Sequence, residues 1–148
     1  MPISYLEGGS GGDGSQDVNN NAVTTNNLTA AKAVIKTTID KKLVVAANSA
    51  STPLDLSAAG VFKVTIGAST AFVFSNCPNT GGDVFTFGII TKNDGVGGRS
   101  VSFPANVHWA GGIIPPRTTG ANAEDVWSFY TEDNGTTYVG SLSIADDH

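Results

Sequence analysis

The segment Ser100–Pro116, SVSFPANVHWAGGIIPP, decides the fold that this chain predicts. It begins with an extended stretch, Val101–Phe103, which Pro104 ends because proline fixes φ and has no backbone N–H. Gly111–Gly112 then allows the chain to reverse beside a tryptophan ring, and Pro115–Pro116 stiffens the next stretch of chain as polyproline II. The segment therefore predicts β-strands joined by rigid corners.

Two runs downstream of this segment predict the last strands: DVWSFYT (Asp125–Thr131) and GTTYVG (Gly135–Gly140). Successive residues of a strand point to opposite faces, so Trp127 and Phe129 share one face of the first run. If one face of that strand is core, the other offers surface to a partner. Between the two runs, Asn134–Gly135 predicts a tight turn.

Upstream, short runs of β-branched and aromatic residues predict the remaining strands. The expected strands are Leu43–Ala47, Val61–Ile66, Ala71–Ser75, Val84–Thr91 and Arg99–Phe103, with a final strand at Thr136–Ser143. In Val61–Ile66, the alternation of side chains leaves open which face is core: the one with Phe62, Val64 and Ile66, or the one with Val61 and Lys63.

Turn-forming residues separate these runs. Ser51–Gly60 carries turn chemistry, and Lys92–Gly98 predicts a hairpin loop in which Asp94–Gly95 supplies positive-φ geometry. About seven or eight short strands, with turns roughly every 8–12 residues, predict an all-β fold: an antiparallel β-sandwich or jelly-roll-like domain. We find no internal repeat in the sequence and no alternation of strands with helices.

The N-terminal part of the chain differs in composition. Residues 1–27 include the glycine-rich run Gly8–Gly14 and too few apolar side chains to form a core. Leu28–Ile39 fits either a helix capped by Thr29 or an extended segment, and its β-branched residues favour the extended form. We therefore expect an extended Gly/Asn-rich N-terminal arm over residues 1–41, used in anchoring and assembly, and a β-sandwich domain over 42–148.

Composition and charge exclude several classes of protein. The chain has 148 residues, a formal net charge of −5 and only eight Lys and Arg, which do not make the basic face of a nucleic-acid-binding protein. Cys77 is the single cysteine, so neither an intrachain disulfide nor a Cys-based zinc site is expected. There is no signal-peptide pattern and no run of ~20 apolar residues. We expect a soluble protein made in a cytoplasm, with no nucleic-acid or membrane partner.

The sequence offers little catalytic chemistry. Glu124–Asp125 and Glu132–Asp133 are adjacent pairs whose members point to opposite faces of a strand, which does not suit an acid–base couple. Asp125 is better placed to accept hydrogen bonds from backbone donors at the start of its strand. The C-terminal cluster of Asp146, Asp147 and His148 is expected to be a solvated tail. We therefore predict no enzyme activity, no catalytic residues, no metal and no cofactor.

A pattern spread over residues 60–145 resembles the terminal β-sandwich domain of bacteriophage structural proteins, both tail-fibre tips and capsid decoration proteins. The positions that carry the resemblance are Val101, Phe103, Pro104, Trp109, Gly111, Gly112, Pro115, Asp125, Val126, Phe129, Gly135, Thr136, Thr137 and Gly140. The resemblance implies a virion β-sandwich that assembles as a homotrimer, and it does not distinguish head from tail.

A short chain with an N-terminal arm and no shaft favours a capsid decoration (cement) protein on the virion surface, with the major capsid protein and itself as partners. The residues expected at assembly interfaces are Tyr5, Leu6, Trp109, Ile113, Pro115, Trp127 and Phe129. The alternative is a tail-fibre or adhesin module that binds host-surface glycan through exposed aromatic side chains.

Overall fold

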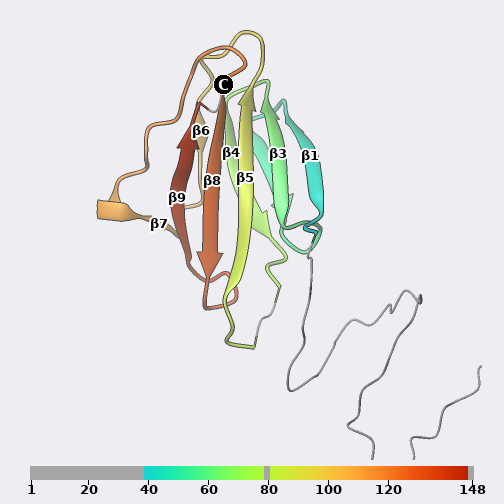
Figure 1. Ribbon diagram of the computed structural model, residues 1–148, viewed down its shortest axis with the longest axis vertical. Coiled ribbons are helices and arrows are strands. Elements are labelled where there is room, and N and C mark those ends of the chain that lie inside the picture. The colour runs from blue at the N-terminus through green and yellow to red at the C-terminus, as the bar shows by residue number, and fades with distance from the viewer. Residues whose placement is uncertain (1–38, 79–80, 147–148) are drawn as a thin grey trace, which may run out of the picture. The chain divides into compact units, whose positions relative to one another are not determined.

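The computed structural model describes residues 39–78 and 81–146, which form two β-sheets and no α-helix (Figure 1). The strands are β1 (Lys42–Ala47), β2 (Ser51–Asp55), β3 (Val61–Ile66), β4 (Thr70–Ser75), β5 (Phe85–Asn93), β6 (Val101–Ser102), β7 (Val107–Trp109), β8 (Glu124–Thr131) and β9 (Tyr138–Ala145). A 3₁₀ turn, η1 (Ala110–Gly112), comes after β7. The prediction of an all-β fold is confirmed for this part of the chain, in which no helix is long and apolar enough to cross a membrane.

The predicted arm, residues 1–41, lies almost wholly outside the described residues. Tyr5 and Leu6 lie outside them, as does the choice between helix and extended chain for residues 28–38. Asp147 and His148 at the other end of the chain are outside them too. These predictions stay predictions.

The first six strands alternate between the two sheets. The larger sheet has the order β1-β3-β5-β8-β9-β7, and the smaller has the order β2-β4-β6. β1, β3 and β5 run parallel, as do β2, β4 and β6. The chain therefore coils, crossing from one sheet to the other and back, and each coil stacks on the one before it.

The prediction of an antiparallel sandwich is therefore wrong for the coiled half of the fold. Ser51–Gly60 is not a turn throughout, because its first half is β2. Lys92–Gly98 does not close a hairpin, because it joins β5 of the larger sheet to β6 of the smaller. The reason is physical: alternation of apolar and polar residues is the same in parallel and antiparallel strands, so it does not report the direction of the neighbour.

The coils also explain why no repeat is visible in the sequence. Lys42 pairs with Val61 and Val61 with Gly88, so successive coils are offset by 19 and then 27 residues. Stacking requires matching strands but tolerates loops of different length between them. A fixed period is therefore absent although the strands stack in register.

The last strands add an antiparallel meander to the coil. β8 pairs antiparallel with β5 and with β9, and β7 then pairs parallel with β9 at the sheet edge. In the connection between β8 and β9, Asn134 and Gly135 have φ of 56° and 84°. Positive φ at two consecutive residues suits this tight turn, so the turn prediction is confirmed.

The core lies between the two sheets. Phe62, Val64 and Ile66 are fully buried, which settles the face that the sequence left open. Trp127 and Phe129 are also core residues, only 1% and 3% exposed. Aromatic side chains bridge the sheets, and the ring pairs, with their centroid distances, are Phe74–Phe87 at 5.2 Å, Phe74–Phe129 at 5.5 Å and Phe103–Trp127 at 4.9 Å.

Gly140 of β9 is required by this packing. A Cβ at this position would lie 2.9 Å from ring carbons of both Phe129 and Trp109, closer than side chains approach one another. Gly88 of β5 differs, because a Cβ there would meet only the carbonyl oxygen of Trp127, at an ordinary 3.7 Å. The core therefore needs glycine at one of these two strand positions and not at the other.

Gly140→Ala is expected to destabilise the fold by about 1–3 kcal/mol, since the added methyl group overpacks two aromatic rings. Gly88→Ala is the matched control and should leave the free energy of unfolding unchanged or raise it slightly, because glycine weakens a strand interior. Urea denaturation of both variants measures this. Equal destabilisation by the two substitutions would contradict the packing described here.

The outer face of the larger sheet carries an ion-pair cluster. Glu124 Oε2 lies 2.9 Å from Lys63 Nζ, and Glu124 Oε1 lies 2.9 Å from Lys92 Nζ. The hydrogen bonds from Lys92 and Lys63 hold the pKa of the Glu124 carboxyl below its usual range, although burial acts in the opposite direction. The cluster joins β3, β5 and the start of β8.

Glu124→Gln is expected to lower the free energy of unfolding at pH 7 by about 1 kcal/mol. A carboxyl whose pKa is depressed in the folded state stabilises the fold above its unfolded pKa of about 4.3, and this stabilisation is lost as the pH falls through the folded value. The variant should therefore lose less stability than the wild type between about pH 5 and pH 3. Denaturation curves across that interval, with Glu132→Gln as the control at an exposed carboxyl, measure the difference.

Candidate functional site

The 110–116 loop, Ala110–Pro116, projects beyond the sheet edge after β7 (Figure 1). Ile113 and Ile114 are 73% and 48% exposed. The chain reaches them through Gly111 and Gly112, whose φ values of 65° and 72° suit glycine and strain other residues. The loop thus presents two adjacent large aliphatic side chains to solvent. This exposure indicates a contact surface only if the loop is held in place.

Aromatic packing holds the N-terminal end of the loop. Trp109, the last residue of β7, is half-buried and pairs its ring with those of Phe103 and Trp127, at centroid distances of 5.0 and 5.8 Å. The Trp127 indole is fixed in turn, because its Nε1 donates a hydrogen bond to Thr91 Oγ1 at 3.1 Å. The loop therefore begins at a residue packed on the core.

A partly buried polar network holds the C-terminal end of the loop. Arg117 donates from Nη1 to the Arg99 carbonyl oxygen at 2.6 Å and from Nη2 to Asn93 Oδ1. The next residue, Thr118, donates its backbone N–H to Asp125 Oδ2 at 2.8 Å. Burial lowers the pKa of the Arg117 guanidinium from its ordinary value, although the nearby charge of Asp125 acts in the opposite direction.

Asn93 at the end of β5 connects this network to the rest of the segment. It is fully buried, and its Nδ2 donates to the carbonyl oxygens of Thr118 and Gly120, at 3.1 and 2.6 Å. Asp125 also accepts the backbone N–H of Asp146 at 3.0 Å, which confirms the expectation that it satisfies backbone donors. Both ends of the loop are thus fixed to the core, while its tip is exposed.

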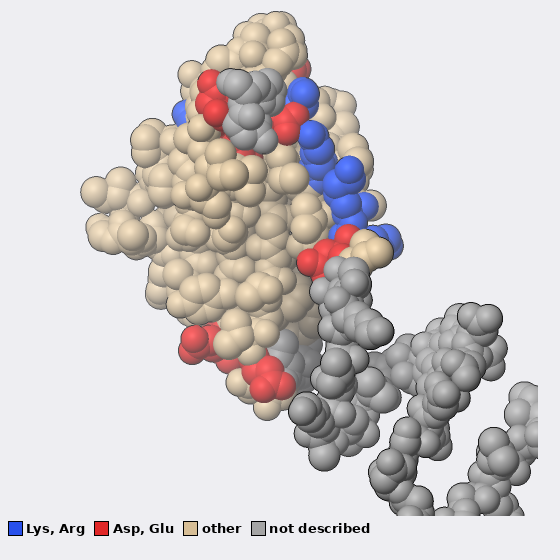
Figure 2. All heavy atoms as spheres, viewed as in Figure 1, with Lys and Arg blue, Asp and Glu red and all other residues tan. Residues whose placement is uncertain are grey.

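Charged residues avoid the surface around the loop. Figure 2 shows an uncharged face over β5, β8 and β9, continuous with the projecting loop. Lys and Arg side chains gather along one side of this face in the figure, and Lys42 and Lys63 lie on β1 and β3, on the side of the sheet opposite β7. Such a surface suits contact with an uncharged partner surface.

The candidate catalytic and metal-ligating side chains of the described residues lie apart from one another. The described residues contain no group of three or more His, Cys, Asp or Glu placed to hold a metal ion. His108 is exposed, and Cys77 lies beside Tyr138, where burial first and then the thiol raise the pKa of the phenol. Glu124 points to the outer face and Asp125 to the core, as the adjacent-pair argument predicted.

The residues expected at interfaces fall into two groups. Ile113 is strongly exposed, Pro115 is half-exposed beside it, and Trp109 supports their loop. Trp127 and Phe129 are buried in the core, so these two cannot contact a partner, because the alternation of β8 places Ser128 and Tyr130 on the outer face instead. The sequence left open which face of β8 was core. Its pairing between β5 and β9 places Trp127 and Phe129 on the buried face of the sheet.

Comparison of the chain with protein-family models, with curated proteins and with solved structures gives no match.

Arg117→Ala is expected to release the 110–116 loop while the sheets remain folded. Amide hydrogen exchange at Thr118, whose N–H donates to Asp125, should accelerate at least tenfold, because the Arg117 hydrogen bonds that hold this segment are lost. Arg99→Ala is the matched control: it removes a partly buried pair with Asp94 at 3.4 Å and keeps the carbonyl that Arg117 contacts. Unchanged exchange in the Arg117 variant would show that the guanidinium does not hold the loop.

Proposed function

We propose that this protein is a structural component of a bacteriophage virion: a decoration (cement) protein that binds the capsid surface as a homotrimer. The proposal starts from the sequence pattern that resembles phage virion β-sandwich domains. Several positions of that pattern lie together in the fold, since Trp109 packs against Phe129, and Gly140 is the glycine that their two rings require. The pattern therefore corresponds to one packed unit that supports the 110–116 loop.

The observation that carries the proposal is the exposure of Ile113 and Ile114 on a loop held at both ends. A free chain gains nothing from holding two isoleucines in water, whereas a partner surface that covers them gains up to ~1.5–3 kcal/mol for Ile113 and about half as much for Ile114, which is already half-buried. Holding the loop in advance also reduces the ordering entropy lost on binding. These features support a protein that acts by contact rather than by chemistry.

In this function the protein adds buried area between capsid subunits and so opposes the outward pressure of packaged DNA. A threefold assembly multiplies a modest contact, because each copy presents the same loop in a symmetric arrangement. The N-terminal arm provides a second attachment in this proposal. The major capsid protein and neighbouring copies are the partners, and the virion surface is the location.

The adhesin alternative relies on exposed aromatic side chains, with Trp127 and Phe129 among those available to stack on glycan. Both are core side chains here, so the alternative loses these two contact residues. Nothing among the described residues favours an enzyme acting on polysaccharide. The decoration role is therefore the function that the geometry supports best.

The double substitution Ile113→Ser, Ile114→Ser tests the proposal. It should leave the melting temperature nearly unchanged, since both side chains are exposed, and should weaken binding to phage heads that lack the protein at least tenfold. Co-sedimentation of the full chain with such heads measures binding, and sedimentation velocity measures trimer formation.

The matched control is Val84→Ser, Val96→Ser, which removes two exposed aliphatic side chains from other loops and should bind like the wild type. Wild-type binding by the isoleucine variant would remove the loop from the proposed contact. Attachment of the wild-type protein to tails and not to heads would overturn the decoration role itself.

A further inference from the structure

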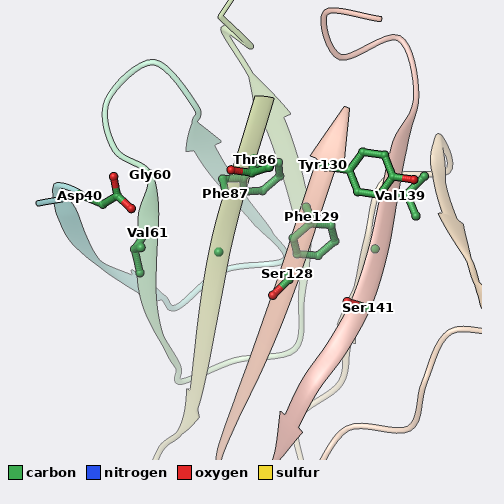
Figure 3. A pocket seen from close by; sticks show the side chains of 12 residues that line it. Asp40, Gly60, Val61, Thr86, Phe87, Ser128, Phe129, Tyr130, Val139 and Ser141 are labelled. Carbon is green, nitrogen blue, oxygen red and sulfur yellow. The ribbon is translucent and has the colours of Figure 1, made fainter. Parts of the chain in front are cut away.

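A groove crosses the outer face of the larger sheet, and no residue of the 110–116 loop lines it. It has a volume of about 470 Å³, within the usual range of ligand sites. Gly88 of β5, Ser128 of β8 and Ser141 of β9 are register partners and form its floor. Figure 3 shows Ser128 and Ser141 on these neighbouring strands. Neighbouring strands lie about 4.8 Å apart, so a groove running from β3 to β9 is about 14 Å long.

The side chains of one register row form a wall of the groove. Thr86, Tyr130 and Val139 pair across β5, β8 and β9, two residues along each strand from the floor. Tyr130 is 39% exposed, and Figure 3 shows its ring beside Val139. The groove is therefore open to solvent and bordered by one accessible aromatic ring.

The floor is open because residue 88 is glycine, and the fold does not require glycine there. Its φ is not in the left-handed region, and an added Cβ would make one ordinary contact. A glycine that weakens a strand without serving its packing often marks a place where a ligand approaches the backbone. Gly140, whose Cβ would meet rings on the inner side, has a packing reason that Gly88 lacks.

The lining fits an uncharged ligand that bears hydroxyl groups. Its one charged member is Asp40, at the end next to Gly60, and the lysines on this face lie outside the lining. Thr86, Ser128 and Ser141 supply hydroxyls that can each donate and accept. The Ser128 hydroxyl shares one hydrogen bond with Ser143, at 2.7 Å, which fixes it and leaves it further capacity.

A peptide fits this groove less well than a sugar. Peptides add to sheets along a free edge, where strand backbone groups are available. The floor here lies in the middle of the sheet, where β5, β8 and β9 each have a paired neighbour on both sides. A ligand across it must bind through side chains, as a pyranose does by placing an apolar ring face on an aromatic side chain and its hydroxyls on serine and threonine.

We infer that the groove over Gly88, Ser128 and Ser141, bordered by Tyr130, is a binding site for a neutral oligosaccharide. This inference does not depend on the decoration role, since no residue of the 110–116 loop lines the groove. It gives the protein a means to bind glycan through residues other than the buried Trp127 and Phe129.

The test applies the full-length chain to a printed array of neutral and acidic oligosaccharides, then titrates the bound sugars into ¹⁵N-labelled protein. We expect binding to neutral members, with amide shifts at Gly88, Ser128 and Ser141. Gly88→Val, which fills the floor, and Tyr130→Ala, which removes the ring, should each weaken binding at least tenfold. Tyr130→Phe should retain it, because the ring face remains.

Gly95→Val is the control for added bulk, since a Cβ at that loop glycine meets nothing within 4 Å. It should bind like the wild type, and all variants should keep the wild-type melting temperature to within a few degrees. Absence of binding to every neutral sugar, a preference for acidic ones, or wild-type binding by the Gly88 variant would overturn the assignment. Loss of trimers in the Gly88→Val variant without loss of sugar binding would instead identify the groove as a subunit contact.

Discussion

The pairing of β5 with β8 is the interaction on which the rest of the structure depends. β5 is the last strand that the parallel coil adds to the larger sheet, where it pairs with β3 on one side, and it begins the antiparallel meander on the other. Through this pairing Phe87 stacks on Phe129, with ring centroids 5.0 Å apart, and Thr91 accepts the indole N–H of Trp127. At the end of the same strand, Asn93 holds the segment just after the projecting loop. One strand thus joins both sheet patterns and positions the exposed loop.

Much of the fold could be predicted from the sequence, but the relative direction of neighbouring strands could not. The expected strand at Val61–Ile66 matches β3 at both ends, and the Asn134–Gly135 turn lies where its dipeptide requires positive φ. What alternation cannot report is whether a neighbour runs parallel, and this is where the antiparallel expectation failed. The strand at Ser51–Asp55 was not predicted for a further reason, because Pro53 argues against a strand. β2 tolerates this proline because it lies at a sheet edge, where a missing N–H costs little.

The surface was harder to predict than the fold. Exposure of Ile113 agrees with its place between glycine and proline corners, whereas burial of Trp127 depended on which face of β8 met the core. The groove had no local signal at all. Its floor comes from three strands that are distant in the sequence, and Gly88 is informative only once the surroundings of its missing Cβ are known. The only sign of the groove in the sequence was a glycine, Gly88, within an otherwise strand-forming run.

The position of β9 has a consequence for how the protein is made. β9 is the last strand of the fold, yet it lies inside the sheet, between β8 and β7, and among the described residues it is the only strand that β7 pairs with in that sheet. During synthesis the 110–116 loop therefore emerges from the ribosome long before the strand that fixes its base. The base of the loop therefore takes its final position only after β9 has been translated. A chain that stops before Tyr138 would lack the strand that β7 pairs with, so the exposed isoleucines would lose the support at the base of their loop.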